Sequence, residues 1–190
     1  MNHLLSKIGS YPFEKLNLLH KDIKPSKDVI NLSIGEPKLN ADSKVLDILN
    51  KEANSFSNYP PMNAIPELSE AYRQYLESHF GIKNVAEDEV CLVAGTREGT
   101  FSIIQALFNK ENVKEKPYVV MPNPFYQIYG GATTLAGGEA KFLDCPEEDN
   151  FQPDLDSLKS EDWQKCQILV LCSPNLSLIH ISEPTRPIAI

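Results

Sequence analysis

The stretch YVVMPNPFYQIYGGATTLAGGEAKFLD (residues 118–144) predicts a strand, a helix and a second strand in succession. The strands are expected at residues 118–122 and 139–144, with the helix at residues 125–138 between them. Apolar strands that alternate with helices are typical of a parallel sheet that is covered on both faces. We therefore expect an α/β fold with a mainly parallel sheet.

The same succession of elements continues on both sides of this stretch. EVCLVAG (residues 89–95) predicts a buried strand and REGTFSIIQALFN (residues 97–109) predicts a helix, whereas CQILVLCSP (residues 166–174) predicts a further strand. Ligands of such sheets bind at the carboxyl ends of the strands. The residues that directly follow each predicted strand are therefore the first candidates for a binding site.

The first ninety residues carry short helical patterns that are separated by proline-containing loops. The expected elements are helices at 12–23, 42–53 and 66–81 and a short strand at 29–37. In the clearest helix, PELSEAYRQYLESHFG, Pro66 fits the first helical position and Gly81 fits a left-handed C-terminal cap.

Composition limits the classes of function. The chain has 190 residues, of which 42% are hydrophobic and 23% charged, which is typical of a globular protein and not of a disordered one. The net charge of −8 and the lack of a basic run argue against nucleic acid or an anionic membrane as a partner. The longest strongly apolar run, at 168–172, is too short to cross a bilayer, and the N-terminus lacks the apolar stretch of a signal peptide. We expect a cytoplasmic protein.

The four cysteines show no C-x-x-C spacing. They are Cys91, Cys145, Cys166 and Cys172. Reduced, buried thiols that act as small hydrophobic residues are favoured over a metal site or a disulfide framework.

The turn AGTREGT (residues 94–100) is a candidate phosphate site. Gly95 allows a tight turn, Thr96 can cap the following helix, and the amides of Thr96 and Arg97 would point out of the helix N-terminus toward an anion. The alternative is a capped turn without a ligand, and one glycine and one threonine do not exclude it.

Two further positions are candidates of the same kind. Tyr126 and Tyr129 follow the strand at 118–122, where an aromatic ring can stack on a planar heterocycle; a tyrosine at this place more often packs in the core. Gly35 in IGEP would let a ligand carboxylate approach the backbone closely, unless it is an ordinary turn glycine.

Taken together, these segments resemble a known family. YPFEKL, NLSIGEPK, YPP…PEL, GTRE, PNPFYQIY and the strand ending in CSPN follow one another as in class I aminotransferases. Over residues 10–175 they are most similar to the bacterial succinyldiaminopimelate aminotransferases of lysine biosynthesis. The resemblance implies the aspartate aminotransferase-like fold (fold type I) of pyridoxal-phosphate-dependent transferases. Residues 1–40 would belong to the small domain and residues 41–175 to an incomplete cofactor-binding large domain.

The resemblance also implies a reaction and a set of site residues. A homodimer would transfer an amino group between glutamate or 2-oxoglutarate and N-succinyl-2-amino-6-ketopimelate with pyridoxal 5′-phosphate. Gly95, Thr96 and Arg97 would hold the cofactor phosphate, Tyr126 would stack on the pyridine ring, Gly35 would approach the substrate carboxylate, and Tyr59 would reach the phosphate in the neighbouring subunit. Ala64 stands where the family has glycine in the loop that places Tyr59.

The end of the chain departs from the family. The SPxNPTG motif of the family would continue after Ser173 and Pro174, but Leu176 stands where the family has the asparagine that contacts the cofactor ring. The aspartate on the pyridine nitrogen, the Schiff-base lysine and the carboxylate-binding arginine that the family places later have no counterpart. LSLIHISEPTR (residues 176–186) resembles the translation of a transposase adapter used in sequencing libraries. We therefore expect residues 176–190 to be a non-native tail and the chain to be an inactive fragment with no catalytic residue. The alternatives are another class I aminotransferase (aspartate, alanine or aromatic) or a short non-catalytic binding module.

Overall fold

The structure, a computed structural model, describes residues 2–30, 39–57, 59, 65–111, 116–175 and 177–178. It divides into two compact units, one made of residues 1–11 and 93–190 and the other of residues 12–92. We call them the sheet unit and the helical unit and describe each by itself. The predicted division at residues 40 and 175 stays a prediction.

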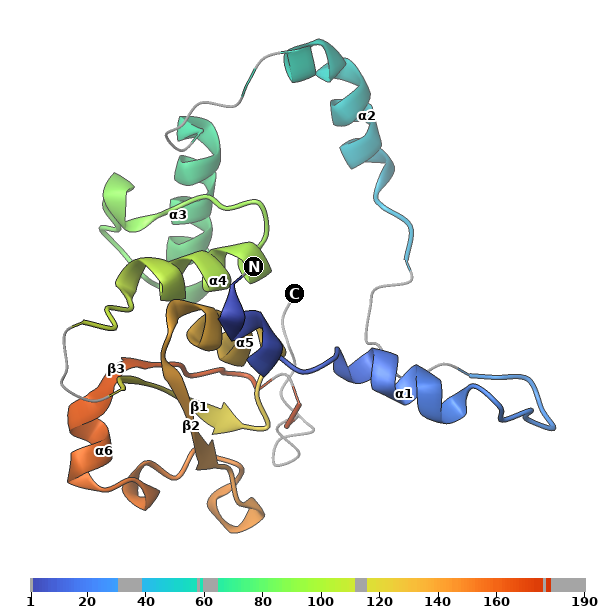
Figure 1. The fold of residues 1–190 in the computed structure, drawn as a ribbon. Coiled ribbons are helices and arrows are strands. Elements are labelled where there is room, and N and C mark those ends of the chain that lie inside the picture. The colour runs from blue at the N-terminus through green and yellow to red at the C-terminus, as the bar shows by residue number, and fades with distance from the viewer. Residues whose placement is uncertain are drawn as a thin grey trace. The chain divides into compact units, whose positions relative to one another are not determined.

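The sheet unit is built on three parallel strands (Figure 1). They are β1 (Tyr118–Asn123), β2 (Glu139–Asp144) and β3 (Cys166–Leu169), in the spatial order β2-β1-β3. The strands predicted at 118–122 and 139–144 are confirmed, and so is the α/β fold with a parallel sheet. β3 is shorter than the predicted 166–174, although the Val170 amide still donates to the Val120 carbonyl at 2.8 Å.

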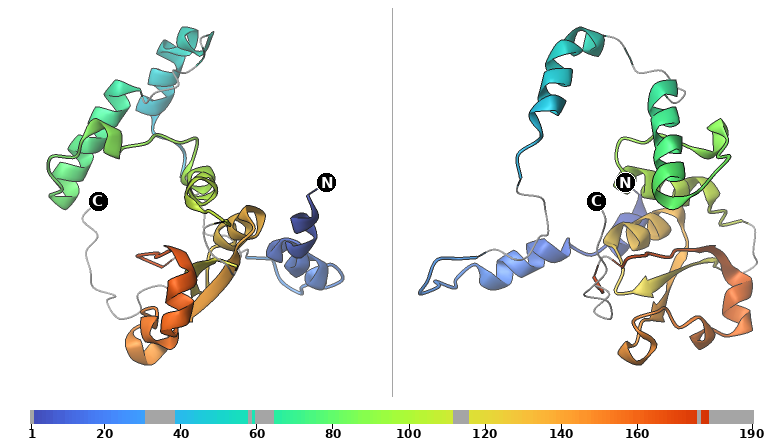
Figure 2. Two further views of the ribbon diagram at one scale, coloured as in Figure 1. Left: turned by 60° about the vertical axis from the view of Figure 1, so that its left-hand side comes forward. Right: turned by 180° about the vertical axis from the view of Figure 1, so that it is seen from behind.

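Helices cover both faces of this sheet. α4 (Thr96–Leu107) packs against α5 (Gln127–Ala136), which follows β1 (Figures 1 and 2). Tyr129 and Ala136 of α5 pack against the face that carries Val119 and Met121. Side chains alternate between the faces of a strand. Lys141, which is the β2 partner of Val120, therefore lies on the opposite face, where its Nζ is 3.3 Å from the Asp162 carboxylate of α6 (Ser160–Lys165).

The core of the sheet unit lies between β1 and the paired helices α4 and α5. Phe108, Val119 and Met121 form its buried centre. The partly buried side chains around it are Phe125, Tyr129, Ala136, Ala140, Ile168 and Val170. The short 3-10 helices of this unit are η1 (His3–Lys7), η4 (Glu147–Asp149) and η5 (Leu155–Ser157).

The strand predicted at residues 89–95 is wrong. A 3-10 helix, η3 (Glu87–Glu89), occupies its start, and Val90 is extended (φ −119°, ψ 116°) without a paired strand in the described part of the chain. The apolar side chain of Val93 is 49% exposed. An apolar run becomes a strand only where a neighbouring strand supplies hydrogen-bond partners, and the sequence pattern does not carry that information.

The helical unit contains α1 (Pro12–His20), α2 (Ser43–Lys51), η2 (Ala53–Ser57) and α3 (Pro66–Phe80). The three predicted helices are confirmed, and α1 ends three residues earlier than expected. α3 begins at Pro66 and ends at Phe80, and Gly81 has the left-handed φ of 69° predicted for its C-terminal cap. Residues 31–37 of the strand predicted at 29–37 lie outside the described residues.

The burial of the four cysteines differs from expectation. All four are free thiols, but Cys91 is exposed and the other three are half-buried, so the predicted full burial is wrong. Burial raises the pKa of the Cys145 and Cys166 thiols above the usual value, which keeps both protonated and unreactive near neutral pH. Among the described residues, no helix is both long and apolar enough to span a membrane.

Candidate functional site

The N-terminus of α4 is the first candidate feature. Gly95 precedes the helix with φ 112° and ψ 143°, a conformation that only glycine adopts without strain. The helix begins at Thr96, so the prediction that Thr96 caps it is wrong: Gly95 holds the cap position, and no side chain caps the helix. A capping side chain must belong to the residue before the first helical one, and that residue has none.

The first turn of α4 leaves backbone donors for an anion. The first hydrogen bond within the helix runs from the Gly99 amide to the Gly95 carbonyl at 3.0 Å, which leaves the amides of Thr96 and Arg97 outside the helical ladder. Both residues are exposed. The Glu98 carboxylate already lies at this end, because a Cβ placed on Gly95 would be 3.0 Å from its Oε2 atom. A phosphate that binds here displaces or shares the position of that carboxylate.

Tyr126 is the second candidate feature. It lies at the N-cap of α5, three residues after β1 ends, and its side chain is half-buried. Tyr129 packs against the core, and its ring meets the ring of Tyr126 edge-on, with centroids 5.8 Å apart and planes at 89°. Core packing, the alternative considered for both tyrosines, therefore describes Tyr129, whereas Tyr126 presents a partly open ring.

These two features lie at the same edge of the sheet. At the other end of α4, the Asn109 backbone exchanges hydrogen bonds of 2.8 and 2.7 Å with the Gln167 side chain, close to the start of β3. α5 runs from the end of β1 to the start of β2. Both helices therefore point their N-termini toward the carboxyl ends of the strands, where ligands of parallel sheets bind. An anion-binding turn and an aromatic ring at one edge suit a phosphorylated aromatic ligand.

The sequence analysis missed Cys172 at this edge. Cys172 follows β3, and its thiol contacts the hydroxyl of Tyr129. The pKa of Tyr129 is raised, first because burial disfavours the phenolate and then because of Cys172. The Cys172 thiol also donates to the Pro174 carbonyl at 3.4 Å. The position of Cys172 near the carboxyl end of a predicted strand could have identified it as a site residue. The apolar sequence around it instead favours a structural role.

The structure does not relate the remaining predicted site residues to this edge. Tyr59 belongs to the helical unit and its side chain is 98% exposed. Gly35 and Ala64 lie outside the described residues.

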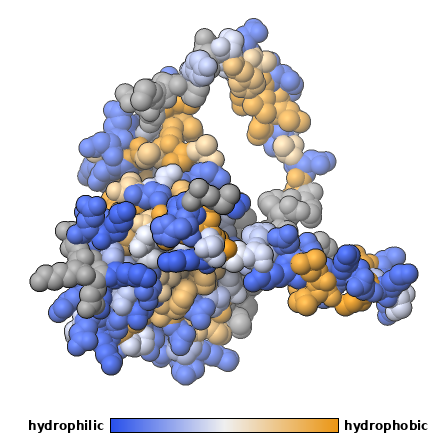
Figure 3. All heavy atoms as spheres, viewed as in Figure 1, coloured by the Kyte–Doolittle hydropathy of each residue, from blue (hydrophilic) through white to orange (hydrophobic). Residues whose placement is uncertain are grey.

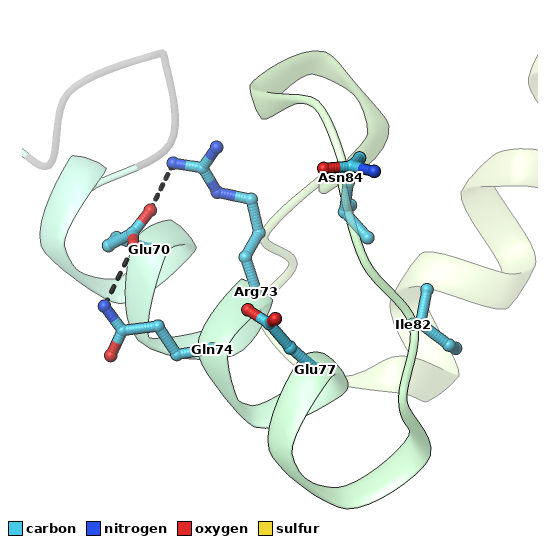
Figure 4. Close-up of a pocket in the computed structure, with 7 residues that line it drawn as sticks. Glu70, Arg73, Gln74, Glu77, Ile82 and Asn84 are labelled. Atoms are coloured by element: carbon cyan, nitrogen blue, oxygen red, sulfur yellow. Dashed lines mark hydrogen bonds and ion pairs between the residues drawn. The ribbon is translucent and has the colours of Figure 1, made fainter.

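Two surface recesses lie elsewhere. The first, of about 160 Å³, is formed by α3 and the segment after it (Figure 4). Three of its polar side chains contact one another: Glu70 accepts from Gln74 at 2.9 Å and pairs with Arg73 at 2.6 Å. It is smaller than the roughly 300 Å³ at which ligand pockets begin. The second, of about 310 Å³, lies at the C-terminal ends of α4 and α5, away from Tyr126. Neither contains a predicted site residue.

Comparison with known proteins places the chain in a family. The family model "Aminotransferase class I and II" matches residues 27–176. The crystal structure of an aminotransferase from Neisseria meningitidis is similar, with a TM-score of 0.83 and 38% identity over 92% of this chain and 44% of that one. The aminotransferase AspB of Helicobacter pylori has a TM-score of 0.79 and 31% identity over 88% of this chain and 43% of that one.

Curated relatives give the same result. The LL-diaminopimelate aminotransferase of Methanocaldococcus jannaschii is 31% identical over 171 residues, which are 87% of this chain and 40% of the relative. That of Natranaerobius thermophilus is 27% identical over 176 residues, or 91% of this chain and 44% of the relative. This chain thus spans less than half the length of the relatives it matches. Enzymes of the family use pyridoxal phosphate and share the α/β fold expected from the sequence, and this chain belongs to the class I and II aminotransferases.

Proposed function

We propose that this chain is the N-terminal part of an aminotransferase that acts on the diaminopimelate skeleton. The parent enzyme would transfer an amino group between glutamate or 2-oxoglutarate and N-succinyl-2-amino-6-ketopimelate. The family match over residues 27–176 and relatives called LL-diaminopimelate aminotransferases support the carbon skeleton. The observation that carries the chemistry is the pairing of an uncapped helix N-terminus with the Tyr126 ring at one edge of the sheet.

In this proposal each residue at the edge has a binding role. The amides of Thr96 and Arg97 hold the cofactor phosphate, and the Arg97 guanidinium adds positive charge beside it. The ring of Tyr126 stacks on the cofactor ring, which supplies the electron sink for the reaction. Gly35 lets the substrate carboxylate approach the backbone. Tyr59 acts across the interface of a homodimer, on the phosphate of the neighbouring subunit.

These residues do not supply the amine that transamination requires. Transamination requires a lysine amine that carries the cofactor and moves a proton. The segments that meet at the carboxyl edge of the sheet, residues 94–100, 121–129, 142–145 and 170–175, contain no lysine. We therefore propose that the 190-residue chain is inactive by itself and that residues 176–190 are not native. Sequencing the gene across codon 175 tests this: an NPTG continuation supports it, and a stop codon after Ile190 in independent clones contradicts it.

The substrate prediction is tested with the complete enzyme. We expect it to convert 2-oxoglutarate to glutamate with N-succinyl-LL-diaminopimelate as amino donor, at a kcat/KM at least about tenfold above that for aspartate or phenylalanine, a discrimination of about 1.4 kcal/mol. A coupled glutamate assay measures the rates. Turnover with aspartate or aromatic donors alone would refute the substrate and leave the aminotransferase class intact.

The names of the relatives favour a second candidate, an enzyme that uses diaminopimelate without the succinyl group. The same assay separates the two when LL-diaminopimelate and its N-succinyl derivative are compared side by side. A higher kcat/KM for the free diamino acid would replace the first candidate by the second.

A glycine substitution tests the phosphate site. In the complete enzyme, Gly95→Ala is expected to weaken pyridoxal phosphate binding by about 1.5–3 kcal/mol, the cost of one lost hydrogen bond to a charged group, because a side chain is strained at φ 112° and shifts the first turn of α4. Titration of the apoenzyme measures the dissociation constant.

Gly137→Ala is the matched control. Gly137 also has a positive φ, 89°, but it caps the C-terminus of α5, at the opposite end of the sheet unit. It should lower the free energy of unfolding by about 1–3 kcal/mol and leave cofactor affinity unchanged. Equal loss of affinity in both variants would mean that Gly95 acts through folding alone.

A further inference from the structure

Tyr129 connects three parts of the sheet unit. Its ring packs against the core beside Val119 and Met121, its ring contacts Tyr126 edge to face, and its hydroxyl contacts Cys172 after β3. The carbonyl of Tyr129 accepts from the Thr133 hydroxyl at 2.7 Å, which fixes the first turn of α5. Tyr129 is thus held from several directions, whereas Tyr126 is half-buried.

We propose that Tyr129 is a positioning residue that orients the Tyr126 ring for the cofactor through their edge-to-face contact, with Cys172 holding the Tyr129 hydroxyl. The inference rests on the proposed function, in which Tyr126 stacks on the cofactor. Edge-to-face pairs are favourable because the positive edge of one ring meets the negative face of the other. The planes of the two rings meet at 89°, and rotation of the Tyr126 ring away from this angle would weaken the contact.

The contact between the Cys172 thiol and the Tyr129 hydroxyl restrains the other end of the Tyr129 side chain. A tyrosine with a free hydroxyl can rotate or shift with its helix, but Cys172 belongs to the segment that follows β3 and is anchored by the Pro174 carbonyl. The position of the Tyr126 ring therefore depends on a contact between α5 and the carboxyl end of β3. Tyr129 links Tyr126 to this segment, because its ring contacts Tyr126 and its hydroxyl contacts Cys172.

A double-mutant cycle on cofactor binding tests the proposal in the complete enzyme. Tyr129→Leu is expected to raise the dissociation constant of pyridoxal phosphate by about 2- to 12-fold, the value of an aromatic pair. In a Tyr126→Leu background the same change should have an effect below about twofold, because the ring it orients is gone. A residue that only supports the fold would weaken binding equally in both backgrounds, and that result would overturn the proposal.

A second cycle keeps the test decisive if Tyr129→Leu does not fold. Tyr129→Phe and Cys172→Ala each remove the hydroxyl–thiol contact and keep the edge-to-face pair. Each should alter the visible circular dichroism of the bound cofactor in the same direction, and the double variant should differ from wild type no more than either single one. Unchanged dichroism in both single variants would overturn the role of Cys172.

Cofactor binding by these variants separates the role of Tyr129 from the proposed function. If wild type binds pyridoxal phosphate and Tyr126→Leu weakens binding while Tyr129→Leu does not, the inference is wrong and the proposed function stands. If wild type shows no saturable binding of pyridoxal phosphate, both are wrong.

Discussion

The 190-residue chain, expressed alone, is expected to be recovered as soluble aggregate or bound to chaperones and not as a cooperatively folding monomer. The physical reason is the distribution of apolar side chains. Among the described residues, the buried hydrophobic side chains all belong to the sheet unit; they are Ile104, Phe108, Val119, Val120, Met121, Ala132 and Leu143. The helical unit has no counterpart to this core in its described part.

The helices of that unit expose the side chains that should stabilise them. In α2 the four apolar residues of the predicted amphipathic face are between 47% and 61% exposed; they are Val45, Leu46, Ile48 and Leu49. Leu19 of α1 is 75% exposed. Figure 3 shows hydrophobic surface along both α1 and α2. Short helices are marginal in water without tertiary packing of such a face, and exposed apolar patches favour association.

The sheet adds a second route to association. β2 and β3 are both edge strands of the described sheet, and the apolar side chains of Leu169 and Leu171 are 39% and 60% exposed. An exposed apolar edge pairs readily with other chains. Size-exclusion chromatography with light scattering and thermal unfolding measures the outcome. A monodisperse monomer with one sharp transition would contradict the prediction and favour the short non-catalytic binding module.

The parts of the fold that were predictable from the sequence are those fixed by local signals. The β1–α5–β2 segment was found because apolar runs and a helical pattern follow each other within residues 118–144. α3 was placed to the residue because Pro66 and Gly81 mark its two ends. The segment at residues 89–95 was misassigned because a strand depends on a distant partner strand.

The candidate site shows the same limit at the level of side chains. Spacing placed Tyr126 and Tyr129 on one turn, but it does not tell which ring packs in the core and which stays open. That distinction follows from the packing of Tyr129 against Met121 and from its contact with Cys172, which is 43 residues away in the chain. Likewise, the sequence favours Thr96 as the cap because threonine is a good capping residue, whereas the backbone places Gly95 at that position.

The second large effect concerns covalent chemistry. When the 190-residue chain is mixed with pyridoxal phosphate and reduced with borohydride, we expect no single lysine to be labelled stoichiometrically. Labelling of one site requires a lysine amine held beside a bound cofactor, with a pKa lowered by its surroundings. The described lysines in or close to α4 and the three strands are Lys110, Lys116, Lys141 and Lys165. Lys110 follows the C-terminal end of α4, and Lys116 precedes β1, so both lie toward the amino ends of the strands.

The other two lysines are also placed away from that edge. Lys141 lies in β2 on the face opposite Val119, where its ammonium group is already paired with the Asp162 carboxylate. Lys165 ends α6, directly before β3 begins. The N-terminus of α4 can still attract the phosphate of the reagent, so weak labelling spread over several lysines agrees with this geometry. Peptide mapping by mass spectrometry measures the distribution, with pyridoxal lacking the phosphate as the matched control. One lysine labelled at a ratio of about one per chain, and only with the phosphorylated reagent, would mean that the chain itself contains the lysine that the proposed function assigns to the rest of the enzyme.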